Sequence, residues 1–557
     1  MSLFKLWIAN ARLSERRASV PMLLTAALVL LALFGAAGQA HAHAVLEQVV
    51  PQADSRMDVG PESVEIVFNE RLDTGGAKLL VLNEASRNVA KGEPERIEEG
   101  KGIRIGLPKL GEGHYTVSYS VISADGHPVS GAYVFTVGNP APLDRSKLNP
   151  HEQVGHAHDH GGSSGLTADA FLLYAARILY YAGLLATAGL ALWSLLRSMS
   201  PTVRGTHSGA LGLAGKFALI ATLAFVFFSL RDLGQGEPLS EWGRILTETT
   251  IGRLYIAELL LALAAPLLPA LGTVPRAAWA AIALFLEAWS GHAAAFTPIS
   301  YTIGLDYAHL LAAALWSGGL LLLLAVWFKE RPEAGRFALV FSKWALISFL
   351  ALWVTGILST LKYVPSLEYL MYTAWGKWLI AKAAVSLLVA VTAFLIRLRL
   401  KKGELPRGGL LKVDVGLLAG IVLCVGVLTY QTPLPVNEPL NFHKMGTDMH
   451  VTLRVSPNAP GDNRFTLKIW LPEWVGEGEA KSVQLRLLPL DKEDMGFIDV
   501  PLQPYEDEEL DAFPDYKKST YTAQGPYLPF AGQWKAQVRV TDSEDTERVV
   551  ETTYRIY

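Results

Sequence analysis

The sequence predicts a multidomain membrane protein with an extracytoplasmic β-sandwich, an eight-helix α-helical transmembrane bundle and a second, C-terminal extracytoplasmic β-sandwich. Three observations lead to this prediction. The 557 residues are 51% hydrophobic and only 18% charged, whereas soluble domains average about 25% charged residues. Long apolar stretches occupy the middle of the chain. Short runs that alternate between apolar and polar residues lie on both sides of these stretches, as in half-buried strands.

The composition also excludes several classes of protein. The formal net charge is -3, so the chain lacks the excess of basic residues with which proteins bind nucleic acid. A single cysteine, Cys424, excludes a disulfide framework and any metal site built from several cysteines. The sequence has no P-loop, no G-x-S-x-G motif and no dinucleotide fingerprint. We therefore expect neither an enzyme nor an ATP-driven pump.

Residues 1–42 have the order of a signal peptide. A basic segment precedes an apolar stretch at 20–34, and small residues then end in Ala40-His41-Ala42. This A-x-A pattern is typical of a cleavage site. Cleavage after its last residue makes His43 the first mature residue. Cleavage two residues earlier would expose His41 instead, and an uncleaved segment would remain as an anchor helix.

Residues 43–139 predict a small all-β domain. Its strand-like runs are separated by Gly, Pro and Asp, and its length suits a β-sandwich. The runs are at 64–68, 78–82, 115–121 and 132–137. A linker at 140–167 follows, in which His156, His158 and His160 alternate with other residues. Such a tract either captures metal loosely or is a solvated spacer.

Residues 168–431 predict the membrane domain. Each of its eight apolar stretches is close to the roughly 20 residues that cross a bilayer as a helix. The stretches are at 170–197, 211–233, 250–272, 276–296, 303–328, 336–361, 373–398 and 410–430. Lys and Arg concentrate in the odd-numbered connections, which predicts that these face the cytoplasm. Both ends of the bundle then lie outside, in a multi-pass protein of the cytoplasmic membrane.

Residues 432–557 return to a composition typical of soluble domains. Alternating runs predict a second extracytoplasmic β-sandwich. These runs are at 450–455, 465–470, 483–488 and 534–540.

The distribution of histidines along the chain indicates what kind of ligand the protein binds. Nine of the 13 histidines fall in the segments predicted to lie outside the cell. Neutral imidazole is the commonest side-chain metal ligand. The bias therefore predicts a metal ion that arrives from outside, although any single surface histidine is also explained by solvation.

The strongest candidate for an outer metal site combines His43 with Asp125 and His127. A free N-terminal histidine chelates a metal ion through its α-amine and its ring together. Asp125 and His127 are two residues apart in the segment SADGHP and add a carboxylate and a second imidazole. This set of nitrogen and oxygen ligands suits Cu(II), with Zn(II) as its competitor. Asp-Gly-His-Pro alone is also an ordinary turn.

Ionisable residues inside the apolar stretches predict a pathway, because such groups are costly in lipid. We expect His292 and His309 at similar depths near the outer face, within the fourth and fifth spans, as membrane metal ligands for Cu(I) or Cu(II). Glu258 and Glu287 lie deeper and either continue a polar route or relay protons. Cys424 in the last span is either a Cu(I) ligand or a packing residue.

A further cluster mixes thioether and imidazole groups just beyond the last span. The residues are His443, Met445, Met449 and His450. Such ligands suit Cu(I), but a chain turn with incidental methionines fits the same residues.

The sequence resembles the CopC and CopD copper protein families. His43 through Pro51, Phe68-Asn69-Glu70 and Ser123 through Pro128 are similar to CopC motifs. The resemblance implies a cupredoxin-like β-sandwich that holds Cu(II) with His43, Asp125 and His127. Met57 is the only methionine of this domain, so the Met-rich Cu(I) motifs of other CopC proteins are missing.

The membrane and C-terminal segments extend this resemblance. The segments around His292, His309 to Leu320, and Trp375 to Lys382 resemble CopD. The whole chain is therefore similar to copper-uptake proteins that fuse CopC to CopD, with a C-terminal domain that looks YtkA-like.

We therefore expect a membrane protein that captures Cu(II) outside the cell and moves copper inward. Its expected partners are the copper ion, the lipid bilayer and an extracytoplasmic copper chaperone or reductase, with no nucleic acid. Two alternatives remain open. One is a copper-resistance, sequestration or sensor protein that does not transport. The other is a membrane haem or electron-transfer protein that uses His292 and His309 as axial ligands.

Overall fold

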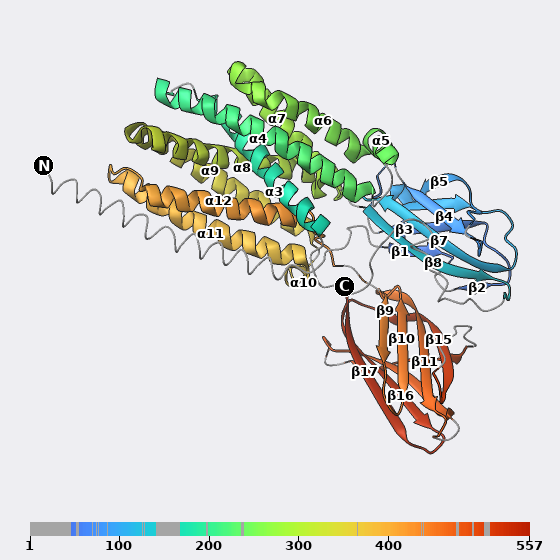
Figure 1. Ribbon diagram of the computed structural model, residues 1–557. Coiled ribbons are helices and arrows are strands. Elements are labelled where there is room, and N and C mark those ends of the chain that lie inside the picture. Colours follow the sequence, from blue (N-terminus) through green and yellow to red (C-terminus); the bar gives the residue numbers. More distant parts are fainter. Residues whose placement is uncertain are drawn as a thin grey trace.

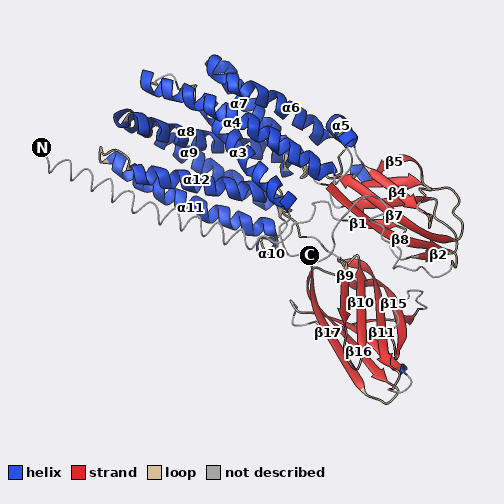
Figure 2. Ribbon diagram, viewed as in Figure 1, coloured by secondary structure: helices blue, strands red, loops and turns tan. Residues whose placement is uncertain are grey.

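The structure, a computed structural model, consists of two β-domains joined by a helical bundle (Figure 1). It describes residues 46–140 and 168–557 except for 52–54, 69–70, 74, 76, 86, 125, 127, 197–198, 235–238, 365, 436, 438, 475–477, 493–494 and 506–512. The predicted signal peptide and nearly all of the predicted linker lie outside the described residues. Both β-domains lie at the same end of the bundle (Figure 2).

The N-terminal β-domain consists of two four-stranded sheets. Their strand orders are β1-β3-β6-β5 and β2-β8-β7-β4. The strands are β1 (Leu46–Val50), β2 (Arg56–Met57), β3 (Ser63–Phe68), β4 (Lys78–Leu82), β5 (Lys91–Ile97), β6 (Gly102–Gly106), β7 (Gly113–Ile122) and β8 (Pro128–Val137). Neighbouring strands run antiparallel, except that β2 pairs with β8 in parallel.

Alternation of side chains builds the core of this domain. In β3, Val64, Ile66 and Phe68 are fully buried, and they share one core with Val117 of β7 and Phe135 of β8. The four predicted runs are found as β3, β4, β7 and β8. The sequence did not predict the other four strands. β2 is only two residues long, and β5 exposes most of its polar side chains at a sheet edge, so neither shows an apolar alternation.

The described part of the bundle has eight long helices with short helical segments between them. The long helices are α3 (Ala168–Trp193), α4 (Pro201–Gly234), α6 (Thr250–Ala264), α7 (Thr273–Ser290), α8 (Ile299–Lys329), α9 (Arg331–Tyr363), α11 (Ala374–Lys401) and α12 (Gly408–Leu428). The short ones are α5 (Leu239–Glu248) and α10 (Tyr369–Tyr372). Two 3-10 segments, η3 (Ala265–Ala270) and η4 (His292–Ala294), follow α6 and α7.

Seven helices of the described chain are long and apolar enough to cross a membrane. The predicted fourth span is not among them. Its helix, α7, has only 18 residues and carries Arg276 and Glu287. It also ends at Ser290, so the expectation that His292 lies within a spanning helix is wrong: His292 lies in η4.

Small residues let the two central helices approach closely. A Cβ added at Gly189 of α3 would lie 2.0 Å from the Ala314 carbonyl oxygen of α8, and one at Gly318 would lie 2.3 Å from the Gly189 backbone. Larger side chains at either position would separate α3 from α8. This contact holds α3, which carries several polar residues, at the centre of the bundle.

The C-terminal β-domain consists of a five-stranded and a four-stranded sheet around one core. Their strand orders are β14-β15-β11-β10-β9 and β13-β12-β16-β17. The strands are β9 (Leu440–Lys444), β10 (His450–Ser456), β11 (Gly461–Pro472), β12 (Ala480–Pro489), β13 (Ile498–Val500), β14 (Gln503–Pro504), β15 (Tyr516–Leu528), β16 (Gly532–Asp542) and β17 (Glu547–Ile556). The four predicted runs are found as β10, β11, β12 and β16.

The last strand of this domain contacts the bundle at α10. The Arg555 guanidinium lies 4.1 Å from the ring centroid of Tyr372, and the Tyr557 ring packs against Tyr369 and Tyr372. The Asn437 side chain also bonds to the backbone of Tyr557 at 2.8 and 2.9 Å. The end of the chain is therefore held against both the bundle and the segment that leaves α12.

The turn between β16 and β17 depends on Asp542, which is fully buried. Its carboxylate accepts backbone N–H bonds from Glu544 and Thr546, both at 2.9 Å, and pairs with Arg548. Burial alone raises the pKa of Asp542, but the hydrogen bonds from Arg548 and the turn outweigh burial and lower it.

We predict that Asp542→Ala destabilises the C-terminal β-domain by about 1–3 kcal/mol, because it leaves buried N–H groups without an acceptor. Folding lowers the pKa of Asp542, so the ionised carboxylate stabilises the folded domain above about pH 3.9. This stabilisation is lost as the pH falls further. Hydrogen exchange of residues 532–556 in the full chain measures both effects. Asp499→Ala, which removes an exposed partner of Arg486, is the control. Equal exchange in the two variants would contradict the prediction.

Candidate functional site

The three predicted Cu(II) ligands, His43, Asp125 and His127, lie outside the described residues. Gly126, between the last two, is described. The ends of its loop are fixed by β7, which ends at Ile122, and by β8, which begins at Pro128.

The first part of this loop is held by backbone hydrogen bonds. Ser123 is fully buried and forms a bridge with Leu72. The Ala124 amide donates to the Arg71 carbonyl at 2.9 Å, and the Gly126 amide donates to the Ser123 carbonyl at 2.9 Å. The main chain next to the predicted ligands therefore has a defined path.

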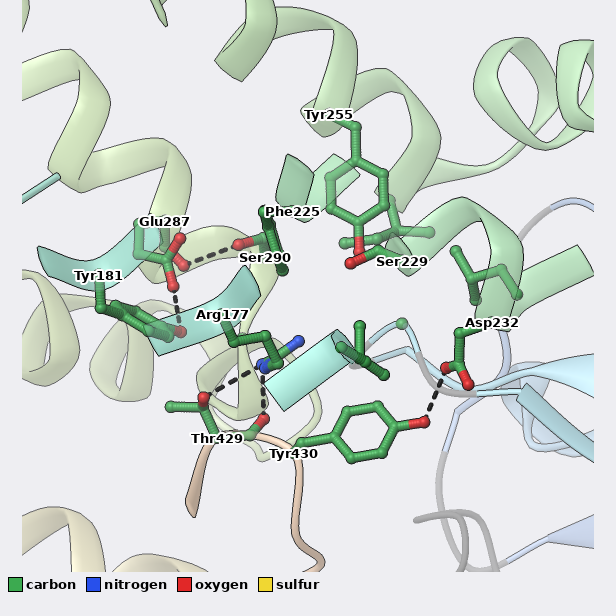
Figure 3. Close-up of a pocket in the computed structure, with 15 residues that line it drawn as sticks. Arg177, Tyr181, Phe225, Ser229, Asp232, Tyr255, Glu287, Ser290, Thr429 and Tyr430 are labelled. Atoms are coloured by element: carbon green, nitrogen blue, oxygen red, sulfur yellow. Dashed lines mark hydrogen bonds between the residues drawn. The ribbon is translucent and has the colours of Figure 1, made fainter. Parts of the chain in front are cut away.

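Gly126 contacts the helical bundle. Its φ of 84° is in the left-handed region that favours glycine, and a Cβ at this position would lie 3.0 Å from Ile251 of α6. Gly126 also lines a pocket that opens into the bundle (Figure 3). The other lining residues are Leu173, Arg177, Tyr181, Phe225, Ser229, Asp232, Leu233, Ile251, Tyr255, Glu287, Ser290, Gly291, Thr429 and Tyr430.

Asp73 of the N-terminal β-domain fixes this contact. Its side-chain oxygens accept the Thr250 amide at 2.9 and 3.0 Å and the Ile251 amide at 3.2 Å. These amides begin α6, where free N–H groups and the helix dipole favour an anion. Asp73 is only 7% exposed, so water competes little for the contact. The β-domain is therefore held against the pocket and is not merely tethered by a linker.

Arg177 of α3 supplies a fixed positive charge in the pocket. Its guanidinium donates to the backbone oxygen of Thr429 at 2.9 Å and to the Thr429 hydroxyl at 3.1 Å. The rings of Phe225 and Tyr430 lie 5.5 and 5.4 Å from it, within cation–π range. Tyr430 in turn donates to the Asp232 carboxylate at 2.7 Å.

Glu287 supplies the opposite charge deeper in the pocket. Its two oxygens accept the hydroxyl protons of Tyr181 at 2.6 Å and Tyr180 at 2.7 Å, and it is only 5% exposed. Both tyrosines come from α3, one residue apart. Both oxygens of the Glu287 carboxylate are therefore held in place by α3.

Glu258 of α6 is a second buried carboxylate near Glu287. It is 5% exposed, Glu287 is its like-charged neighbour, and the hydroxyls of Tyr180 and Ser290 are the donors that face it. Two neighbouring acids in an apolar interior repel each other unless one of them holds a proton or a cation.

The two histidines expected in the membrane contact different elements. His309 of α8 bonds through Nδ1 to the Thr355 hydroxyl of α9 at 2.8 Å, whereas His292 lies in η4 and is 9% exposed. Within the described parts of the chain, no group of three or more His, Cys, Asp or Glu side chains could hold a metal ion. The structure therefore does not bring His292 and His309 into a complete metal site.

Two charged residues of the bundle, Asp306 and Arg177, were not predicted from the sequence. Asp306 interacts electrostatically with His292 and with Lys382 of α11, and Lys382 also with Cys424. Asp306 stands three residues before His309 in an apolar stretch, and Arg177 stands inside the first such stretch. The signal that could have identified both residues was a single charge inside an otherwise apolar stretch.

We predict that Asp73→Ala loosens the N-terminal β-domain from the bundle. The variant removes the acceptor of the first α6 amides, at a cost of about 0.5–2 kcal/mol. The measurement is hydrogen exchange of Thr250 and Ile251 in the full chain, which we expect to become faster by about tenfold. Asp73→Asn, which keeps an acceptor oxygen, shows a smaller change. Glu65→Ala, which breaks an exposed pair with Arg104, is the control. Exchange at wild-type rates in Asp73→Ala would show that the carboxylate does not hold the domain.

Comparison with protein families identifies two copper-related domains. Residues 46–138 match the CopC domain, and residues 167–299 match the copper resistance protein D-like, N-terminal domain. The second match includes Arg177, Glu258, Glu287 and His292. No match tests the expected YtkA-like character of the C-terminal β-domain, which stays a prediction.

Individual proteins show the same similarity. Copper transport protein CutJ of Bacillus subtilis (strain 168) is 27% identical over 459 residues, which are 77% of this chain and 82% of that protein. Copper resistance protein C of Escherichia coli is 33% identical over 111 residues, 18% of this chain and 87% of that protein. The crystal structure of CopC from Methylosinus trichosporium OB3b aligns with 18% of this chain and 99% of its own, at 28% identity and a TM-score of 0.16.

The chain therefore contains a segment that matches the CopC domain and a segment that matches the copper resistance protein D-like, N-terminal domain, in the same order along the chain, and over most of its length it is similar to a copper transport protein.

Proposed function

We propose that the protein captures Cu(II) outside the cell and moves copper inward across the cytoplasmic membrane. The observation that carries this proposal is the position of Gly126. It stands between the expected ligands Asp125 and His127, and it also lines the pocket that leads to Glu287. A copper ion released from this loop would therefore meet the bundle at its polar opening.

Capture depends on His43, Asp125 and His127. Removal of residues 1–42 frees the α-amine of His43, which binds a metal ion together with its own imidazole. Asp125 and His127 complete a set of nitrogen and oxygen ligands suited to Cu(II). The similarity to CutJ, a copper transport protein, supports transport. Sequestration, resistance or sensing without transport is the alternative.

Passage through the pocket is governed by its charges. The guanidinium of Arg177 repels a bare cation, whereas Asp232, Glu287 and Glu258 attract one. Glu287 already accepts hydrogen bonds from two tyrosines, and an arriving cation would relieve its repulsion with Glu258. His292, Asp306 and His309 continue the polar residues beyond the pocket.

The positions of the two β-domains support eight membrane crossings. Both domains lie at the same end of the bundle (Figure 1), and eight long helices connect them. An even number of crossings returns the chain to the side on which it began. We therefore propose that α7 crosses with the other seven helices and that both β-domains are extracytoplasmic, in agreement with the positive residues of the odd-numbered connections.

We predict that Glu287→Gln lowers copper uptake by at least tenfold. The change keeps the shape of the side chain but removes the negative charge that offsets Arg177 and attracts the ion. The measurement is copper accumulation in cells that produce the full chain, corrected for the amount of protein in the membrane. Glu333→Gln, at the start of α9 and paired with exposed Arg336, is the control. Unchanged accumulation in Glu287→Gln and in His309→Ala would rule out this path.

We predict that His127→Gln weakens Cu(II) binding at the N-terminal β-domain by at least tenfold, which corresponds to about 1.4 kcal/mol, because an imidazole ligand is lost. Titration of the purified full chain with Cu(II) measures the change. N-terminal sequencing of the same sample locates the cleavage site. His114→Gln, a change at a buried histidine that bonds to Thr136 in the same domain, is the control. A mature chain that starts at a residue other than His43 would contradict the assigned ligand set.

A further inference from the structure

The hairpin between β9 and β10 brings two histidines and a methionine to one face of a sheet. His443 is opposite Thr452, and Lys444 is opposite Val451. Continuing this register by one pair sets Met445 opposite His450. Residues that are opposite each other or two apart share a face, so His443, Met445 and His450 lie together.

The neighbouring residues confirm which face this is. Val451 is fully buried and Met449 is 6% exposed, and both belong to the core of the C-terminal β-domain. The face that carries His443 and His450 is therefore the outer face. Met449 belongs to the opposite face and is not part of this group.

His450 is buried on the outer face between two aromatic rings. It is 8% exposed, and its centroid lies 4.7 Å from that of Phe513 and 4.5 Å from that of Tyr516. The Gly446 backbone of the hairpin loop is a polar neighbour of the ring, but Nδ1 has no well-formed hydrogen bond in the described part of the chain. A buried polar atom left unpaired is costly, and a metal ion bound at Nδ1 would remove this cost.

His443 is oriented by a neighbouring side chain. Its Nδ1 bonds to the hydroxyl of Thr452 at 2.7 Å, which leaves Nε2 free of that contact. The ring also meets Trp470 edge-on, at 6.4 Å between centroids. A hydrogen bond to one imidazole nitrogen commonly fixes the orientation in which the other binds a metal.

The hairpin loop itself is held in place. The Tyr516 hydroxyl donates to the Thr447 carbonyl at 3.0 Å, so the tyrosine that packs on His450 also fixes the turn. Met445 stands at the start of this turn and is 61% exposed. Its flexible thioether can reach the two imidazoles from solvent.

The available ligands select the metal. No third His, Cys, Asp or Glu completes a site with these histidines among the residues that the structure describes, and the further ligand type on the same face is the thioether of Met445. Thioether and imidazole together favour Cu(I) over hard or borderline ions such as Zn(II). We propose that His443, Met445 and His450 form a Cu(I) site in the C-terminal β-domain, distinct from the Cu(II) site expected at the other β-domain.

The test is competition for Cu(I) between the purified full chain and a chromophoric Cu(I) chelator under reducing conditions. We expect Met445→Leu and His443→Gln each to lower the affinity for one Cu(I) ion per chain by at least tenfold. Both side chains are exposed, so neither change disturbs folding. Met495→Leu, an exposed methionine of the same domain, leaves Cu(I) binding unchanged.

X-ray absorption of the Cu(I)-loaded chain provides a second readout. We expect a copper–sulfur contribution in the wild type that decreases in Met445→Leu and persists in Met495→Leu. Identical Cu(I) affinity and stoichiometry in wild type, Met445→Leu and His443→Gln would overturn the proposal. So would Zn(II) binding at the same residues as tightly as Cu(I). Because the copper-uptake measurement on Glu287→Gln is separate, failure here leaves the proposed transport untouched.

Discussion

The structure depends on one buried anion at a helix terminus. Asp73 caps the first amides of α6, and this is the contact that sets the CopC domain on the membrane domain. It acts together with the close approach of Gly126 to Ile251 of the same helix. The two contacts hold the loop around Gly126 over the pocket.

Next to that contact, the bundle contains charged side chains that would be unstable in lipid without partners. Arg177 is shared between Thr429 and two aromatic rings, and Glu287 is held by a pair of tyrosines. Each charge therefore has partners from helices far apart in the sequence. Glu258 adds a second acid beside Glu287, with the hydroxyls of Tyr180 and Ser290 as its neighbours. Two acids close together inside a bundle are expected where a proton or cation is exchanged, and not where packing alone is required.

The sequence predicted those features that have a local signature. The apolar length of the helices and the alternation of strands such as β3 were sufficient for the architecture, and the acids in apolar stretches drew attention to Glu258 and Glu287. The contacts that build the pocket have no such signature. Asp73 lies 177 residues from Thr250, and Arg177 lies 252 residues from Thr429. No sequence periodicity links positions so distant. The contact between the N-terminal β-domain and the bundle, and the lining of the pocket, could therefore be identified only from the three-dimensional structure.

The two β-domains then differ in the copper chemistry proposed for them. The N-terminal set consists of an amine, imidazoles and a carboxylate, which favour Cu(II), whereas the C-terminal set replaces the carboxylate with a thioether, which favours Cu(I). Since both domains lie at one end of the bundle (Figure 1), the same face of the membrane would present a site for each oxidation state. A single electron separates the two proposed states of the ion, so a copper ion that passed from one site to the other would have to gain or lose that electron on the way.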